Sequence, residues 1–218
     1  MRMIGFALFL GLLAGPALAQ GGKGAPPSSG PTAPVAQSAA AQAISALPME
    51  IAGYRRNPQL TDFEARPNGA GLGAGADYQG GPGDPAVTVF LYDRRRGTLS
   101  GDANHHVVSE ELDMSSREIA GVGAQRGYRV AARRRLPDLV GPAGPALRCD
   151  QYDLAYNDNT VATSYACLGL AGGRIFKFRA THGRRPAGGP PGPLPEALTR
   201  ALFTAAGGQG GAAAGVKG

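Results

Sequence analysis

The feature that most constrains the chain is its pair of cysteines, which lie at equal distances from a turn sequence. The sequence Asn157-Asp158-Asn159 is predicted to form this turn. Asn and Asp are typical of turns because they tolerate left-handed backbone angles and form hydrogen bonds with their own backbone. If the flanking strands pair symmetrically about Asp158, Cys149 and Cys167 face each other. Opposed residues of an antiparallel pair are about 4.5–5.5 Å apart, which permits a disulfide, although a one-residue bulge would spoil the register. The sequence therefore predicts a hairpin closed by Cys149–Cys167.

The hairpin continues into a third strand, so that residues 147–182 read as an antiparallel meander. A second turn at 171–174 is followed by strict alternation over 175–181. One side of that strand carries Phe176, Phe178 and Ala180, and the other carries Lys177, Arg179 and Thr181. This period of two is typical of a half-buried strand.

The N-terminus resembles a secretory signal peptide over residues 1–19. Arg2 precedes a short apolar run, and Ala17-Leu18-Ala19 fits a small-x-small cleavage site. An uncleaved anchor helix is the alternative, but the apolar run is shorter than the about 20 residues that span a bilayer. We expect cleavage after Ala19, no transmembrane anchor in the mature chain, and a periplasmic or secreted location. Export favours a structural disulfide over a metal or redox site.

Composition divides the remaining chain into three parts. Residues 20–46 contain mostly Gly, Pro, Ala and Ser, which bury too little apolar surface to offset their ordering entropy, so we expect a disordered linker there. Residues 47–206 are expected to form a single α+β domain, and 207–218 a flexible Gly/Ala tail. The domain is predicted to contain an antiparallel sheet of about six strands.

Two helices are predicted to pack on this sheet. The first covers 104–125, because an apolar stripe recurs there at helical spacing; Asp102 or Asn104 is its expected N-cap and Gly127 its C-cap. The second follows Pro195 near the C-terminus. Between 69 and 78 glycine alternates with other residues, which predicts a strand with one nearly bare face that another element can approach closely. The same stretch matches G-x-G-x-x-G/A, but a loop sequence follows it instead of a helix, so no nucleotide or other cofactor is predicted.

The formal net charge is +6, and most of the basic residues are arginines, several of which occur in runs. The runs at strand ends are candidates for contact with an anionic partner: Arg94, Arg95, Arg96, Arg133, Arg134 and Arg135. Such a surface attracts anions at low salt. The alternative is that these arginines are only solvated turns, and export argues against nucleic acid as a partner.

Candidates for catalysis or metal binding are few. His106 and Glu110 are four residues apart and would share a helix face, His105 is adjacent, and His182 is the remaining histidine. A metal site needs a third ligand from elsewhere. The alternative to a metal site is that these side chains are simply exposed at the start of a helix and at the end of a strand. No nucleophile has a visible base partner, and no catalytic residue is predicted.

The order of elements resembles the PsbP-like fold group and a group of uncharacterised exported bacterial proteins. The segments that carry the resemblance are LPMEIAGYRR, AVTVFLYD, the helix after it, and GGRIFKFRAT before the last helix. The resemblance implies a non-enzymatic binding or assembly role and transfers no functional residue. We therefore expect an exported binding module whose partner is unknown, either an envelope protein or an anionic envelope polymer. A metal-dependent or other hydrolase and a polymer binder acting through the arginines are the alternatives.

Overall fold

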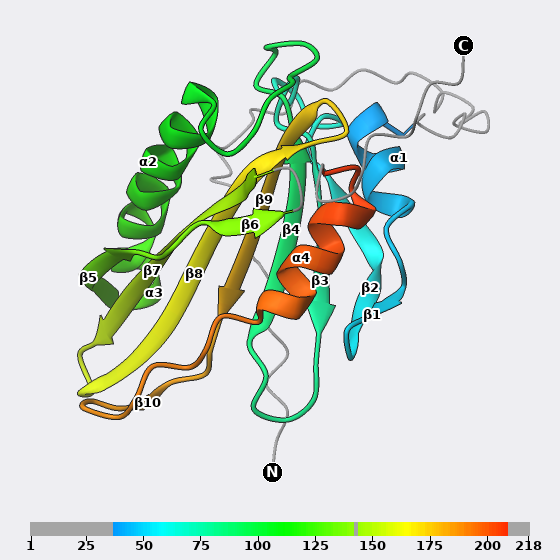
Figure 1. The fold of residues 1–218 in the computed structure, drawn as a ribbon. Coiled ribbons are helices and arrows are strands. Elements are labelled where there is room, and N and C mark those ends of the chain that lie inside the picture. Colours follow the sequence, from blue (N-terminus) through cyan, green and yellow to red (C-terminus); the bar gives the residue numbers. More distant parts are fainter. Residues whose placement is uncertain (1–36, 142–143, 209–218) are drawn as a thin grey trace, which may run out of the picture. The chain divides into compact units, whose positions relative to one another are not determined.

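The computed structural model describes residues 37–141 and 144–208, and its strands form one antiparallel sheet (Figure 1). The strands are β1 (Glu50–Ile51), β2 (Tyr54–Asp62), β3 (Ala74–Gln79), β4 (Ala86–Tyr92), β5 (Tyr128–Arg135), β6 (Leu139–Gly141), β7 (Gly144–Tyr156), β8 (Thr160–Ala171), β9 (Arg174–Thr181) and β10 (Arg185–Pro186). The helices are α1 (Ala39–Ser45), α2 (His106–Gly121), α3 (Gly123–Arg126) and α4 (Glu196–Ala205). The predicted α+β class is confirmed.

The sheet has ten strands in the described residues, so the prediction of about six is wrong. The main path is β1-β2-β3-β4-β9-β8-β7-β5, with β10 paired to β8 and β6 paired to β7. Three of the strands, β1, β6 and β10, contain only two or three residues. Segments that short show no alternation of apolar and polar residues, because alternation needs at least about four residues to be recognised.

The central meander has the predicted register. Cys149 lies opposite Cys167 in the β7–β8 pair, and their sulfur atoms are bonded. The turn is held by Asp158, whose carboxylate accepts hydrogen bonds from the backbone and hydroxyl of Thr160, and Asn159 is left-handed at φ 59°. A two-residue turn at Gly172 and Gly173, both with positive φ, joins β8 to β9, as expected for a tight hairpin. The predicted disulfide is therefore confirmed.

The two faces of the sheet pack against different helices. One face, called here the α1/α4 face, is apolar and includes the disulfide, Phe176 and Phe178, all fully buried. The Phe176 ring also meets Phe203 of α4 at 5.3 Å between centroids. The opposite face, called the α2 face, packs Leu168 and Ile175 against α2. Figure 1 shows α2 at the left of the sheet and α1 at the right, with α4 between them in front of the strands.

Helix α1 lies inside the region predicted to be a disordered linker, so the linker prediction is wrong for residues 39–45. The short side chains Ala40 and Ala41 are buried, as is Ile44, because small residues let the helix lie close to the sheet. The backbone and hydroxyl of Ser38 donate hydrogen bonds to Asp62 of β2, both at 2.9 Å. Arg56 donates to the carbonyls of Ile44 and Ser45 at the other end. The folded domain therefore begins well before Leu47, the predicted boundary.

The two predicted helices are present, with different details. The first is divided into α2 and α3 around Val122, and its N-cap is His105 instead of Asp102 or Asn104. Asp102 instead accepts a hydrogen bond from the backbone of Asn104 in the preceding turn. Gly127 ends α3 with φ 71°, as predicted, and α4 begins directly after Pro195.

The predicted ends of the chain are only partly described. The expected flexible tail is wrong at its start, because Gly208 is buried and pairs with Ala171. Residues 1–36, with the predicted signal peptide and most of the predicted linker, and residues 209–218 lie outside the described residues. No helix in the described part of the chain is long and apolar enough to cross a bilayer.

Candidate functional site

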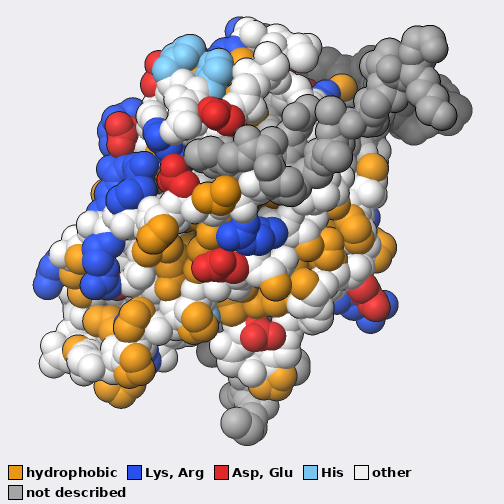
Figure 2. Space-filling view, in the orientation of Figure 1, with side chains coloured by type: hydrophobic (Ala, Val, Ile, Leu, Met, Phe, Trp, Pro, Cys, Tyr) orange, Lys and Arg blue, Asp and Glu red, His pale blue; other side chains and the backbone are white. Residues whose placement is uncertain are grey.

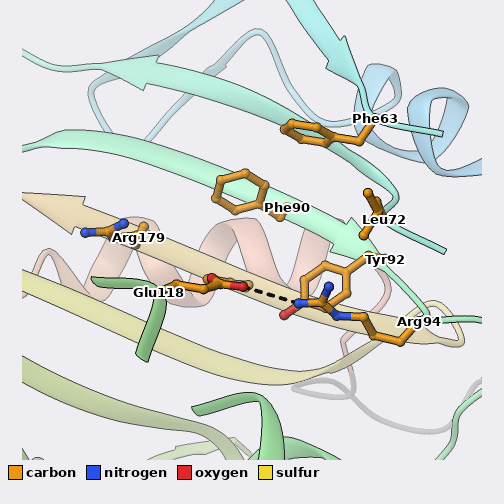
Figure 3. A pocket seen from close by; sticks show the side chains of 8 residues that line it. Phe63, Leu72, Phe90, Tyr92, Arg94, Glu118 and Arg179 are labelled. Atoms are coloured by element: carbon orange, nitrogen blue, oxygen red, sulfur yellow. Dashed lines mark hydrogen bonds and ion pairs between the residues drawn. The ribbon is translucent and has the colours of Figure 1, made fainter. Parts of the chain in front are cut away.

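A groove opens on the α2 face where the helix stops covering the sheet. Helix α2 packs over β8 and β5, so the same face of β4 and β9 is left partly open. The groove has a volume of about 220 Å³. Its lining residues are Phe63, Leu72, Phe90, Tyr92, Arg94, Glu118, Lys177 and Arg179, which Figure 3 shows as sticks.

The floor of the groove is set by the register of three strands. Phe90 of β4 lies between Gly75 of β3 and Lys177 of β9. In the next row on the same face, Arg179 lies opposite Thr88. A side chain at position 75 would meet the Phe90 ring at 3.0 Å. The strand predicted for residues 69–78 begins only at Ala74, so Gly75 is the one alternating glycine that lies within it. The bare position at Gly75 gives the Phe90 ring room to lie over β3.

The apolar wall comes from the loop before β3. Phe63 approaches Phe90 with 6.2 Å between ring centroids, and Leu72 remains 43 % exposed. Gly73 anchors this loop, because its carbonyl accepts hydrogen bonds from the backbones of Phe63 and Glu64. Its φ is +68°, and a Cβ there would overlap the carbonyl oxygen of Leu91. Only glycine fits this position, so the loop is fixed with an apolar side chain facing the groove (Figure 3).

Lys177 is a nearly buried cation in the middle of β9. Its side chain lies over the Phe90 ring, with the ammonium 5.8 Å from the centroid, and the ammonium donates to Glu118 Oε2 at 2.7 Å. Burial lowers the pKa of Lys177, although the Glu118 carboxylate opposes that effect. Burying a cation is costly unless it is paired, and here the partner is a carboxylate whose side chain is 47 % exposed.

Arg179 lies two residues further along the same face, and among the described residues it forms no ion pair. Its buried Nε also has no hydrogen-bond partner in this part of the chain. Burial lowers the pKa of Arg179, and the nearby positive charge of Arg126 adds to the lowering, whereas the Tyr128 hydroxyl and the Glu118 charge oppose it. A guanidinium has five N–H donors in a planar fork suited to carboxylate or phosphate. The donors of Arg179 are therefore underused in the described structure.

Arg94 closes the end of the groove and connects it to α2. It pairs with Glu111, which is fully buried and also accepts a hydrogen bond from the Tyr92 hydroxyl at 2.9 Å. Burial and the Glu111 charge both raise the pKa of Tyr92 well above its ordinary value. Arg94 also reaches Glu118 Oε1 at 3.4 Å, drawn as a dashed line in Figure 3. One carboxylate, that of Glu118, therefore bridges Arg94 and Lys177.

The groove is consequently rich in positive charge. Three cations line it, whereas its lining includes one carboxylate, that of Glu118. Burial raises the pKa of Glu118, but the charges and hydrogen bonds of Lys177 and Arg94 lower it more, so the net shift is downward. Glu118 is then ionised at neutral pH. Charges in such a partly desolvated site interact more strongly than charges in bulk water.

Most of the arginines predicted to contact an anion already have carboxylate partners in the structure. Arg133 and Arg135 both pair with the buried Asp150, and Arg134 pairs with Asp153. Figure 2 shows acidic and basic side chains interspersed along the edge where β5 and α2 lie. These arginines connect the edge strand β5 to β7, and their carboxylate partners reduce the charge available to an external polymer.

The run at 94–96 is not the solvated turn that was the alternative to a predicted anion contact. Arg96 pairs with Glu110 at 2.8 Å, and Arg94 pairs with Glu111. Arg95 donates to the carbonyl of Ala70 and forms no ion pair with any described residue. The run therefore docks the turn after β4 onto α2, because the neighbouring helix presents carboxylates to it.

The structure does not bring the metal candidates together. His105 and His106 stack with 4.5 Å between ring centroids at the start of α2, and Glu110 is engaged by Arg96. His182 bonds to the carbonyl of Pro193 and packs against Tyr165 on the α1/α4 face. The described residues contain no group of three or more His, Cys, Asp or Glu side chains arranged to hold a metal ion.

Comparison of the chain with protein-family models, curated proteins and solved structures gave no match. The functional argument therefore depends on the groove itself. Sequence reasoning placed Lys177 and Arg179 correctly on one face of a strand but treated them as ordinary solvent-facing residues. The signal that could have revealed them is two cations within a strand of a central meander, where both faces are largely buried.

Proposed function

We propose that the protein is an exported, non-enzymatic binding module that holds an organic anion in the groove over β4 and β9. The observation that carries the proposal is Arg179, a partly buried arginine whose Nε is buried without a hydrogen-bond partner and whose guanidinium forms no ion pair among the described residues. An unpaired cation in a desolvated site costs folding free energy. An anionic ligand that accepts the free N–H donors would offset that cost, and it would gain charge-assisted hydrogen bonds.

Binding fits the groove better than catalysis does. Its titratable groups are three cations, one tyrosine held by Glu111 and one carboxylate already shared between two cations. This arrangement stabilises a negative charge in a fixed place. The histidines that would serve as general bases lie at the start of α2 and beyond the end of β9, and they do not line the groove. A role as binder of an anionic envelope polymer through the arginine runs has less support, because most of those side chains are paired.

Export is part of the same proposal. A buried disulfide is the expected state of paired cysteines in an oxidising compartment. The sequence pattern at residues 1–19 supports a periplasmic or secreted location with cleavage after Ala19. The intact mass of protein from the envelope or medium tests this, and a cytoplasmic protein that retains Met1 would contradict it.

The binding proposal is tested with two anions of different shape, 2-naphthoate and inorganic phosphate. Calorimetric titrations at low and high salt compare the natural protein with Arg179→Gln and with the matched control Arg95→Gln. We expect at least one probe to bind, with about tenfold or greater loss in Arg179→Gln, the effect of losing a hydrogen bond to a charged group. Added salt should weaken the binding. Binding of neither probe, or equal loss in both variants, would contradict the proposal.

A further inference from the structure

The Glu118 carboxylate lies where the acid group of a ligand is expected to lie. Its two oxygens contact two different cations, Oε2 with Lys177 at 2.7 Å and Oε1 with Arg94 at 3.4 Å. The spacing of these two cations is therefore already matched to one carboxylate. Glu118 comes from the exposed side of α2 and is about half exposed, so it can turn into solvent without disturbing the buried side of the helix.

The apolar part of the groove lies beside these cations. Phe90 forms the floor next to Lys177, and Phe63 and Leu72 form the wall (Figure 3). Leu72 is one of only a few large apolar side chains among the described residues that remain substantially exposed. An apolar group that covered Phe90 and Leu72 would remove both from water, which is favourable in proportion to the buried area.

We propose that the ligand is a small carboxylic acid with a planar apolar body of one or two rings, and that its carboxylate displaces Glu118 from Lys177 and Arg94. This inference rests on the groove being the ligand site. The ring body would lie against Phe90, Phe63 and Leu72, and Arg179 would supply further donors to the acid. The groove volume of about 220 Å³ is below the usual range for pockets that hold drug-sized ligands. The groove therefore limits the apolar body of the ligand to one or two rings.

Displacement makes Glu118 an internal competitor of the ligand. Glu118 stays ionised at neutral pH because Lys177 and Arg94 lower its pKa against the effect of burial. The free protein therefore keeps its cations paired, and a ligand binds only if its own acid group and apolar body outweigh the pair it replaces. Removing the charge at position 118 should strengthen ligand binding, whereas removing any group that only supports the site would weaken it.

The test is calorimetric titration of 2-naphthoate into the natural protein, Glu118→Gln and the matched control Glu110→Gln. Glu110 is a similarly exposed α2 carboxylate that pairs with Arg96 outside the groove. We expect Glu118→Gln to bind about three- to fivefold more tightly, the upper part of the range for an exposed ion pair, because Glu118 contacts two cations. Glu110→Gln should bind as the natural protein does. Phe90→Leu should weaken binding severalfold, because it removes the aromatic floor.

Two further probes separate the parts of the inference. The neutral amide 2-naphthamide lacks the charge and should bind much more weakly, and it should not respond to Glu118→Gln. Phosphate lacks the apolar body, so it should bind more weakly than 2-naphthoate. If 2-naphthoate binds in an Arg179-dependent manner but Glu118→Gln weakens it or leaves it unchanged, the displacement is wrong and the anion site stands. If phosphate binds as well as 2-naphthoate, the ring-bearing ligand is wrong. If neither anion binds, the proposed function itself fails.

Discussion

Phe178 and Arg179 are neighbours in the chain, yet they lie on opposite faces of β9 in opposite environments. Phe178 points into the α1/α4 face, where it is fully buried next to Val89 and Cys167. Arg179 points to the α2 face, beyond the cover of the helix, and lacks an ion-pair partner among the described residues. One face is built for stability, and the other retains cations that cost stability. Such a local departure from good pairing is expected where a protein binds something.

The largest expected difference between the two faces is in folding stability. Phe178→Ala should lower the free energy of unfolding by about 3–5 kcal/mol, because it leaves a cavity in a closely packed core. Arg179→Gln should change it by less than about 1 kcal/mol, since the substitution removes a partly buried charge without an ion-pair partner along with some packing. Urea denaturation of both variants provides the measurement. Equal destabilisation would show that Arg179 is a structural residue and would weaken the functional contrast between the faces.

The disulfide lies on the α1/α4 face. We expect it to affect folding stability but not ligand binding on the α2 face. It closes a loop with a sequence separation of 18, and removing such a link costs about 3 kcal/mol in the chain-entropy model. The double variant Cys149→Ala/Cys167→Ala should therefore melt at a lower temperature but bind 2-naphthoate normally below its melting point. Loss of binding in a protein that is still folded would mean that the two faces are coupled.

Arg94 and Arg95 allow a comparison of two neighbouring substitutions, for which we expect a smaller difference in folding stability. Both have positive φ, 54° and 60°, so replacement by Ser perturbs the backbone equally. Arg94→Ser should cost about 1–3 kcal/mol, because it leaves the fully buried Glu111 without its cation. Arg95→Ser should stay within about 0.5 kcal/mol. Thermal melts of the two single variants would contradict the account if their order were reversed.

The smallest expected effect is a pH dependence specific to the groove. The groups that face Glu118 are Lys177 and Arg179 from β9, Tyr92 from β4, and Arg94. The lowered pKa of Glu118 means that its stabilising ion pairs are present above its ordinary value of 4.5 and are lost as pH falls through the lower folded value. Naphthalene-2-sulfonate stays charged in acid, so it should bind severalfold more tightly as Glu118 becomes protonated below pH 4.5. Glu118→Gln should lack this rise, and the same acid response in both proteins would exclude Glu118 as its cause.

Local patterns in the sequence were sufficient for the meander. The Asn-Asp-Asn turn specified the register of β7 and β8, and that register placed Cys149 opposite Cys167. The alternation over 175–181 assigned Phe178 and Arg179 to the correct faces. These features depend on contacts close in sequence, for which turn chemistry and periodicity are direct evidence.

Long-range pairing could not be predicted in the same way. Helix α1 looked like linker because its apolar side chains are mostly alanines, whereas its buried face and its bonds to Asp62 and Arg56 show that it belongs to the domain. The carboxylate partners of the arginine runs come from α2 and β7, elements separated from them along the chain. The groove likewise depends on which strands α2 leaves uncovered. Local sequence patterns do not predict how a helix is placed on a sheet.

The central claim is that an organic anion binds over β4 and β9. Amide and methyl NMR mapping of the purified protein with 2-naphthoate tests this claim most directly. The account predicts that the largest shifts occur at Phe90, Lys177 and Arg179, with a methyl shift at Leu72 and a side-chain shift at Glu118. Residues of the arginine-rich edge strand β5 should change little. Shifts confined to β5, or a saturating interaction that leaves Phe90 and Arg179 unperturbed, would contradict the account.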